Sequence, residues 1–161
     1  MGRRLGLIIG TNQYQDPAFR PLQFAESDAR ALAQWLVNAK GGKWASSDVQ
    51  FAQGSQVTKE LVESLVTQMC LHIAEPGDTV FIYFAGHAFV DEKNGNGYLA
   101  LTDTCYQNPA TGFHISSFAQ KVMNRSRATH TLFLADCFQN GRPWSANRSS
   151  PFDSKPLFGS T

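Results

Sequence analysis

The sequence contains few cysteines and no long apolar segment. Three cysteines occur in 161 residues, and their odd number and wide spacing argue against a disulfide framework and against a zinc cluster. No stretch approaches the roughly 20 apolar residues of a membrane-spanning helix. The N-terminus also lacks the apolar core of a signal peptide. We therefore expect a cytoplasmic protein with no metal site, no cofactor and no membrane partner.

An excess of charge of either sign is also missing. The formal net charge is +1, so the chain carries no electrostatic signature for binding nucleic acid. It has no Walker A loop and no glycine-rich dinucleotide fingerprint, which argues against a flavodoxin-like or nucleotide-binding function. Apolar content of 42% and charged content of 17% are typical of a globular protein.

The length and composition predict one folded domain followed by a tail. A chain of 161 residues is long enough to bury a core without disulfides. After residue 141 the composition shifts to Ser, Pro, Asn and Arg. We therefore expect a domain over residues 1–141 and a flexible tail or linker over residues 142–161.

The hydrophobic pattern alternates between short apolar runs and stretches of helical spacing. This order predicts a three-layer α/β/α sandwich with a mostly parallel central sheet. The expected strands cover residues 3–10, 49–51, 79–84 and 131–135, with a hairpin formed by 89–90 and 98–101, and the expected helices cover 22–38, 58–73 and 115–123.

Two of the expected strands end in residues that are typical of catalytic sites. The run over 79–84 breaks into Ala85-Gly86-His87, and the run over 131–135 breaks into Asp136-Cys137. The carboxyl ends of parallel strands share one edge of a sheet, which is where α/β proteins bind ligands. A cysteine and a histidine at that edge form a possible nucleophile and base.

Five segments, in order along the chain, resemble the caspase-like cysteine peptidases, which include caspases, metacaspases and their bacterial relatives. The segment over residues 81–87 is similar to their Tyr-Phe-Ser-Gly-His-Gly segment. The other segments similar to that family, in its large-subunit portion, are residues 4–14, 22–36, 98–103 and 132–141.

This resemblance implies a cysteine endopeptidase that cleaves after Arg or Lys. Cys137 is the expected nucleophile and His87 its base, because peptide cleavage requires a thiolate that an adjacent imidazole stabilises. The backbone N–H groups of Gly86 and Cys137 are the expected oxyanion donors. Asp28 is expected to bind the basic substrate side chain, and Asp136 is the candidate for a second carboxylate there. Calcium activation, common among metacaspases, remains open.

The sequence departs from the family motif in two places. Ala88 follows His87 where the family usually has glycine. Counted from Asp136 and Gly141, the nucleophile position falls on Phe138 rather than Cys137. Either a bulge at the end of the strand re-aims Cys137 towards His87, or Phe138 replaces the nucleophile and the protein is a catalytically dead module that binds and regulates a partner.

The resemblance also bears on partners. Besides a protein or peptide substrate, we expect a small-subunit portion or a partner chain to complete the sheet, because caspase-like domains usually continue past the nucleophile into a second, smaller part. An unpaired sheet edge favours pairing with another strand.

Overall fold

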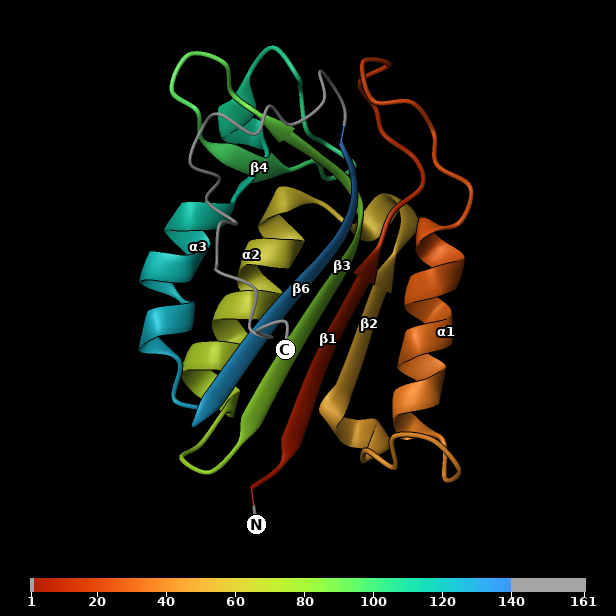
Figure 1. Ribbon diagram of the computed structural model, residues 1–161, viewed down its shortest axis with the longest axis vertical. Helices are drawn as coiled ribbons and strands as arrows, with labels where there is room; N and C mark the ends of the chain where they lie inside the picture. The colour runs from red at the N-terminus through yellow and green to blue at the C-terminus, as the bar shows by residue number, and fades with distance from the viewer. Residues whose placement is uncertain (1, 140–161) are drawn as a thin grey trace, which may run out of the picture.

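Strand β3 (Thr79–Val90) lies at the centre of a six-stranded sheet in the computed structural model, which describes residues 2–139 (Figure 1). The other elements, in chain order, are β1 (Arg4–Gly10), α1 (Ala25–Val37), η1 (Ser46–Asp48), β2 (Val49–Gln53), η2 (Gly54–Gln56), α2 (Lys59–Thr67), the π-helical η3 (Gln68–Ile73), β4 (Gly97–Leu99), η4 (Pro109–Thr111), β5 (Phe113–His114), α3 (Ile115–Lys121), η5 (Met123–Arg125) and β6 (His130–Gln139).

Most of the sheet is parallel. Strand β1 pairs with the first part of β3, from Arg4 opposite Thr79 to Gly10 opposite Ala85, and β2 pairs with the other side of β1. Strand β6 runs parallel along the opposite side of β3. Only β4 and β5 are antiparallel, and they extend the upper part of the sheet. The prediction of a mostly parallel α/β fold is confirmed.

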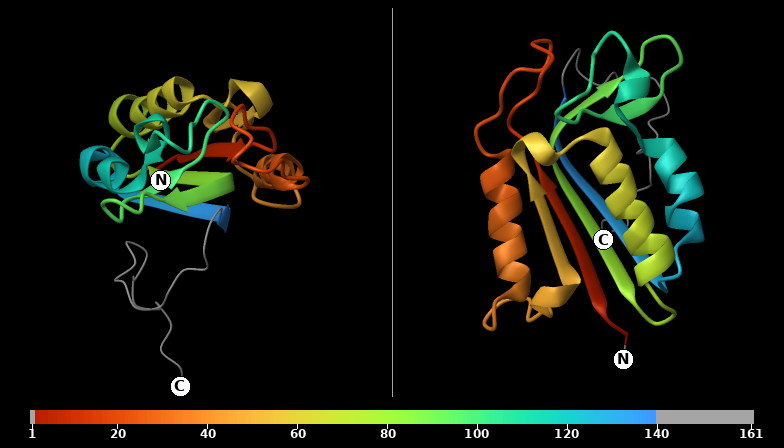
Figure 2. Two further views of the ribbon diagram at one scale, coloured as in Figure 1. Left: turned by 90° about the horizontal axis from the view of Figure 1, so that it is seen from above. Right: turned by 180° about the vertical axis from the view of Figure 1, so that it is seen from behind.

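Helices cover the two faces of the sheet unequally. The residues Val80, Ile82 and Phe84 of β3 belong to a buried cluster that includes α2 and α3. Alternate residues of the same strand, Tyr83 and Ala85, pack instead with α1. Because successive side chains in a strand point to opposite faces, α1 lies on one face and α2 with α3 on the other. Figure 2 shows that α1 flanks β1 and β2 and does not extend over β6.

The predicted elements occur close to their expected places. The expected helix over 22–38 is α1, and the hairpin joins β3 to β4. Helix α2 begins after Thr58, whose side-chain oxygen accepts a hydrogen bond from the N–H of Leu61 at 3.3 Å, as expected for an N-cap.

Two strands are longer than the sequence indicates. Strand β3 continues through Gly86-His87 to Val90, and β6 continues through Asp136-Cys137 to Gln139. Each extension has a pairing partner, because β3 and β6 stay in register as far as Ala88 opposite Gln139. His87 and Cys137 therefore lie within paired strands. The sequence predicted that the strands would end at residues 84 and 135 and that both side chains would lie in loops.

The predicted domain boundary at residue 141 and the predicted tail over 142–161 lie outside the described residues. Within residues 2–139, no helix is both long enough and apolar enough to cross a membrane.

The close approach of β1 to α1 gives a testable prediction for stability. A Cβ at Gly10 would lie 2.7 Å from both the Ala25 carbonyl oxygen and the Ala29 Cβ. We expect Gly10→Ala to lower the free energy of unfolding by about 1–3 kcal/mol, because α1 must move away from the sheet. Urea denaturation measures this change.

The matched control is Gly6→Ala in the same strand. There the nearest atom to an added Cβ is a ring carbon of Trp44 at 3.3 Å, and a side chain yields more easily than a helix backbone. An equal loss of stability in the two variants would contradict the proposed role of Gly10.

Candidate functional site

His87 is buried in the upper part of β3, with 1% of its surface exposed. Its ring Nε2 lies 2.7 Å from the carbonyl oxygen of Arg20, in the loop that follows β1. Its ring Nδ1 lies 3.1 Å from the carbonyl oxygen of Phe138 in β6. The imidazole therefore connects the N-terminal loop to the last strand across the carboxyl end of the sheet.

Both partners of the His87 ring are hydrogen-bond acceptors. A neutral imidazole carries one N–H and donates to only one carbonyl, whereas the imidazolium form donates to both. Neither ring nitrogen is directed at a thiol. In this arrangement His87 fastens two segments of backbone together.

Tyr14 supports the position of His87 from the other side of its backbone. The Tyr14 hydroxyl accepts a hydrogen bond from the His87 N–H at 2.9 Å and donates to the carbonyl of Thr11 at 3.2 Å. Burial, chiefly, raises the pKa of this phenol well above its usual value, so it stays protonated at neutral pH. Gly86 leaves room for the hydroxyl, because a Cβ there would lie 2.9 Å from the Tyr14 oxygen.

Cys137 and Phe138 lie on opposite faces of the sheet. In the β3–β6 register, Gly86 is opposite Cys137 and His87 is opposite Phe138. Residues opposite each other in neighbouring strands share a face, and the Phe138 ring accordingly packs edge-on against the His87 ring, with a centroid separation of 5.6 Å. The register continues to Gln139 without the bulge that would re-aim Cys137.

The surroundings of Cys137 do not favour a thiolate. Its side chain packs against the buried cluster on the α2 and α3 face. Burial, together with the charge of Asp136, raises the pKa of the Cys137 thiol to about 12. A catalytic cysteine requires the opposite shift, which a neighbouring imidazolium provides.

The two carboxylates predicted to bind substrate, Asp28 and Asp136, both lie near Tyr83 on the His87 side of the sheet. The Tyr83 hydroxyl donates to Asp136 Oδ2 at 3.1 Å. Burial first, then the charges of Asp136 and Asp28, raises the pKa of Tyr83 to about 12. Asp28 is exposed in the first turn of α1. This acidic pair, Asp28 and Asp136, provides negative charge next to an uncovered part of the sheet.

The structure thus brings His87, Phe138, Asp28 and Asp136 to one face and leaves Cys137 on the other, across the sheet from His87. Sequence analysis missed the supporting roles of Tyr14 and Arg20. Tyr14 was visible as part of a motif-like loop, but its contact with His87 depends on how that loop folds back. Arg20 acts through its carbonyl oxygen, which every residue type has.

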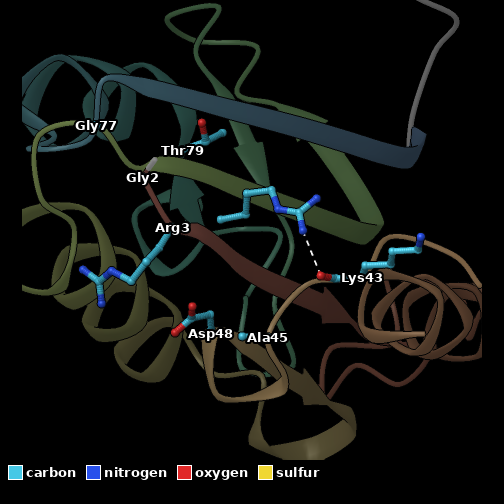
Figure 3. Close-up of a pocket in the computed structure, with 8 residues that line it drawn as sticks. Gly2, Arg3, Lys43, Ala45, Asp48, Gly77 and Thr79 are labelled. Atoms are coloured by element: carbon cyan, nitrogen blue, oxygen red, sulfur yellow. Dashed lines mark hydrogen bonds between the residues drawn. The ribbon is translucent and has the colours of Figure 1, made fainter. Parts of the chain in front are cut away.

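A hollow lies at the end of the sheet opposite His87, near the amino ends of β1 and β3 (Figure 3). Its volume is about 680 Å³. Two of its basic side chains are already engaged by the fold: Arg3 pairs with Asp78 at 2.9 Å, and Arg4 donates to the carbonyls of Gly42 and Lys43. The hollow is therefore distinct from the site around His87. Among residues 2–139, no three His, Cys, Asp or Glu side chains cluster as a metal site requires.

Comparison with protein families identifies the class. The caspase domain model of the C14 peptidase family matches residues 3–155. Together with the parallel sheet and a histidine at its carboxyl end, this match shows that the chain belongs to the caspase-domain family of cysteine peptidases. No curated protein matches the chain significantly.

Among solved structures, the chain resembles protein GSU0716 from Geobacter sulfurreducens, with a TM-score of 0.61 and 19% sequence identity. The match covers 83% of this chain and 48% of the Geobacter protein. At this identity the likeness supports the fold alone. The chain spans about half the length of that neighbour.

The environment of Cys137 predicts how its thiol reacts. Because its pKa is raised to about 12, we expect iodoacetamide to alkylate Cys137 slowly at pH 8, with a rate that rises about tenfold per pH unit up to pH 10. Exposed Cys105 serves as the internal comparison, and mass spectrometry of peptides reports each site. A Cys137 rate that levels off below pH 8 would indicate a thiolate stabilised by His87.

Proposed function

We propose that the chain is a caspase-domain module that binds a basic peptide segment and does not cleave it. Phe138 takes the position at which a nucleophile would face His87. The observation that carries this proposal is the pairing of His87 with Phe138 in the β3–β6 register.

The contacts of His87 support a non-catalytic role. A base must reach the proton that it removes, at a heavy-atom distance of about 2.6–3.2 Å. The His87 Nδ1 atom lies at this distance, 3.1 Å, from the carbonyl oxygen of Phe138 and not from a thiol. The Phe138 ring lies beside the imidazole, where it obstructs the approach of a substrate carbonyl. Cys137, on the other face, is separated from His87 by the sheet itself.

The acidic pair supports the choice of ligand. Asp136 accepts a hydrogen bond from the Tyr83 hydroxyl, and the charge of Asp28 also acts on that phenol, so both carboxylates place negative charge near Tyr83 on the face that carries His87. A guanidinium can form paired charge-assisted hydrogen bonds with such carboxylates. We therefore assign a segment containing Arg or Lys as the bound ligand.

Family membership favours a second candidate function, a cysteine peptidase that cleaves after Arg or Lys with Cys137 and His87 as its dyad. This function requires the end of β6 to slip by one residue against β3, because such a slip moves Cys137 to the His87 face. The two candidates make opposite predictions for which residue position reacts with a directed label.

The variant Phe138→Cys tests the position of the missing nucleophile. We expect its new thiol to lie against His87 and to react at pH 7 at least about tenfold faster with a peptidyl-arginine chloromethyl ketone than an ordinary thiol, because each unit by which the thiol pKa falls raises the thiolate fraction about tenfold. Leu134→Cys, on the same face of β6 but further from His87, is the matched control. Adding His87→Ala should remove the enhancement.

The same chloromethyl ketone, applied to the natural chain, can contradict the proposal by reacting with Cys137. A covalent adduct on Cys137 that is lost in Cys137→Ala and in His87→Ala would establish the peptidase dyad instead. Equal reactivity of Phe138→Cys and Leu134→Cys would also contradict the proposal, since it would place position 138 away from the imidazole.

The acidic pair predicts a separate binding result. We expect Asp28→Asn combined with Asp136→Asn to weaken binding of an Arg-containing peptide about three- to tenfold, as removal of two partly exposed ion pairs does. Fluorescence anisotropy of a labelled peptide measures the affinity. Asp48→Asn, near the hollow at the other end of the sheet, should leave it unchanged, and an equal effect there would indicate non-specific attraction.

A further inference from the structure

Charge is distributed unevenly between the two ends of the parallel sheet. The segments that precede parallel strands lie together at the amino end of a sheet. Those that precede β1, β2, β3 and β6 contain six basic and three acidic residues, over 2–4, 38–48, 74–78 and 122–129. The rest of residues 2–139 contains five basic and nine acidic residues. The amino end of the sheet is therefore the more favourable end for binding an anion.

The hollow near the amino ends of β1 and β3 lies at this basic end. Its walls come from the segments before β2 and β3, on either side of β1 (Figure 3). Hydrogen bonds fix both walls to β1. The Thr79 N–H donates to the Arg3 carbonyl at 2.9 Å. The Arg4 guanidinium donates to the carbonyls of Gly42 and Lys43 at 3.1 and 2.8 Å. The hollow is thus formed by the fold itself, and its volume of about 680 Å³ is typical of small-molecule sites.

The Arg4 guanidinium keeps donors available for a ligand. Its contacts with the Gly42 and Lys43 carbonyls use two of the five N–H groups that a guanidinium carries. The guanidinium carbon lies 5.4 Å from the centre of the Trp44 ring, so the indole covers one of its faces and a ligand must approach its edge. A planar guanidinium held in this way can bind two oxygens of a phosphate group.

Lys43 provides a second cation at the hollow, at a cost in backbone strain. Its φ is 56°, and among residues 2–139 it is the only non-glycine residue with a positive φ. Glycine adopts this conformation without steric strain. The Lys43 side chain lines the hollow and makes no hydrogen bond or ion pair with any described residue. A strained residue whose side chain contributes nothing to the fold indicates a functional constraint.

The other polar side chains of the hollow favour a ligand that also carries hydroxyl groups. Thr79 lies opposite Arg4 in the β1–β3 register, so its hydroxyl lies on the same face as the guanidinium. The Asp48 carboxylate accepts hydrogen bonds from hydroxyls and repels a bare phosphate. Neither Asp48 nor Thr79 uses its side chain on a described residue. The described residues that line the hollow include no aromatic side chain on which a nucleobase could stack.

We propose that this hollow binds a phosphorylated sugar, with its phosphate on Arg4 and Lys43 and its hydroxyls on Asp48 and Thr79. Arg3 adds little to the attraction, because Asp78 pairs with it at 2.9 Å. The site lies at the opposite end of the sheet from His87, and no described residue of β6 lines it. It is therefore independent of the proposed peptide site.

Nuclear magnetic resonance of the full chain tests the site directly. Ribose 5-phosphate, inorganic phosphate and ribose are titrated separately at constant ionic strength. We expect ribose 5-phosphate to cause saturable shifts of the Lys43 and Gly77 amide signals, with an affinity at least about threefold higher than that of inorganic phosphate, because the hydroxyls add hydrogen bonds. Ribose alone should cause no shift.

Lys43→Gly separates ligand binding from stability. We expect it to weaken binding of ribose 5-phosphate at least about fivefold, since a charge-assisted hydrogen bond is lost. The melting temperature should not fall, because glycine relieves the positive φ. Lys40→Ala is the matched control: it removes the same charge from the same turn, but Lys40 does not line the hollow, and the affinity should change by less than about twofold.

Asp48→Ala separates the sugar from the phosphate. Without the carboxylate, we expect inorganic phosphate to bind more tightly and the preference for ribose 5-phosphate to disappear. Loss of affinity for both probes would contradict the assigned role of Asp48.

Three further results would overturn the inference. Shifts that grow with concentration and never saturate would mean that the basic end attracts anions without a site. Equal losses in Lys43→Gly and Lys40→Ala would lead to the same conclusion. Equal affinity of the natural chain for ribose 5-phosphate and inorganic phosphate would mean that the hollow takes an adventitious ion only.

Discussion

The structure depends on the pairing of β3 along both of its sides. Strand β1 holds one side from Thr79 to Ala85, and β6 holds the other from Thr79 to Ala88. Beyond Ala85, β6 and then β4 keep the strand extended through Gly86-His87, where glycine and histidine would otherwise favour a turn. The pairing also fixes the face to which each side chain points. This one register places His87 and Phe138 on one face of the sheet and half-buried Cys137 on the other.

Much of the fold was predictable because its signals are local. Buried parallel strands read as continuous apolar runs, and Thr58 marked the start of α2 by its capping side chain. The ends of the two central strands were not predictable in the same way. Whether Ala85-Gly86-His87 leaves the sheet depends on whether β6 and β4 are present to pair with it, and that is a long-range property.

The candidate site also combines features that the sequence predicts with features that depend on long-range contacts. The sequence identified His87 as a residue of interest and associated Asp28 and Asp136 with a basic ligand. It left open whether position 137 or position 138 faces the histidine, because one residue of slip exchanges the two faces of a strand. In the paired register of the structure, Phe138 is the residue that lies opposite His87. The contacts from Tyr14 and from the Arg20 carbonyl required the folded loop.

The two carbonyl contacts of the His87 ring affect whether this histidine is retained during evolution. A residue kept only for catalysis is free to drift once the nucleophile is gone. Here a smaller side chain would leave the carbonyl that accepts the ring's hydrogen bond without that donor, at a cost of about 1–3 kcal/mol where the carbonyl remains shielded from water. Selection for stability alone would preserve the imidazole. A retained histidine is therefore weak evidence of hydrolysis in descendants of this fold.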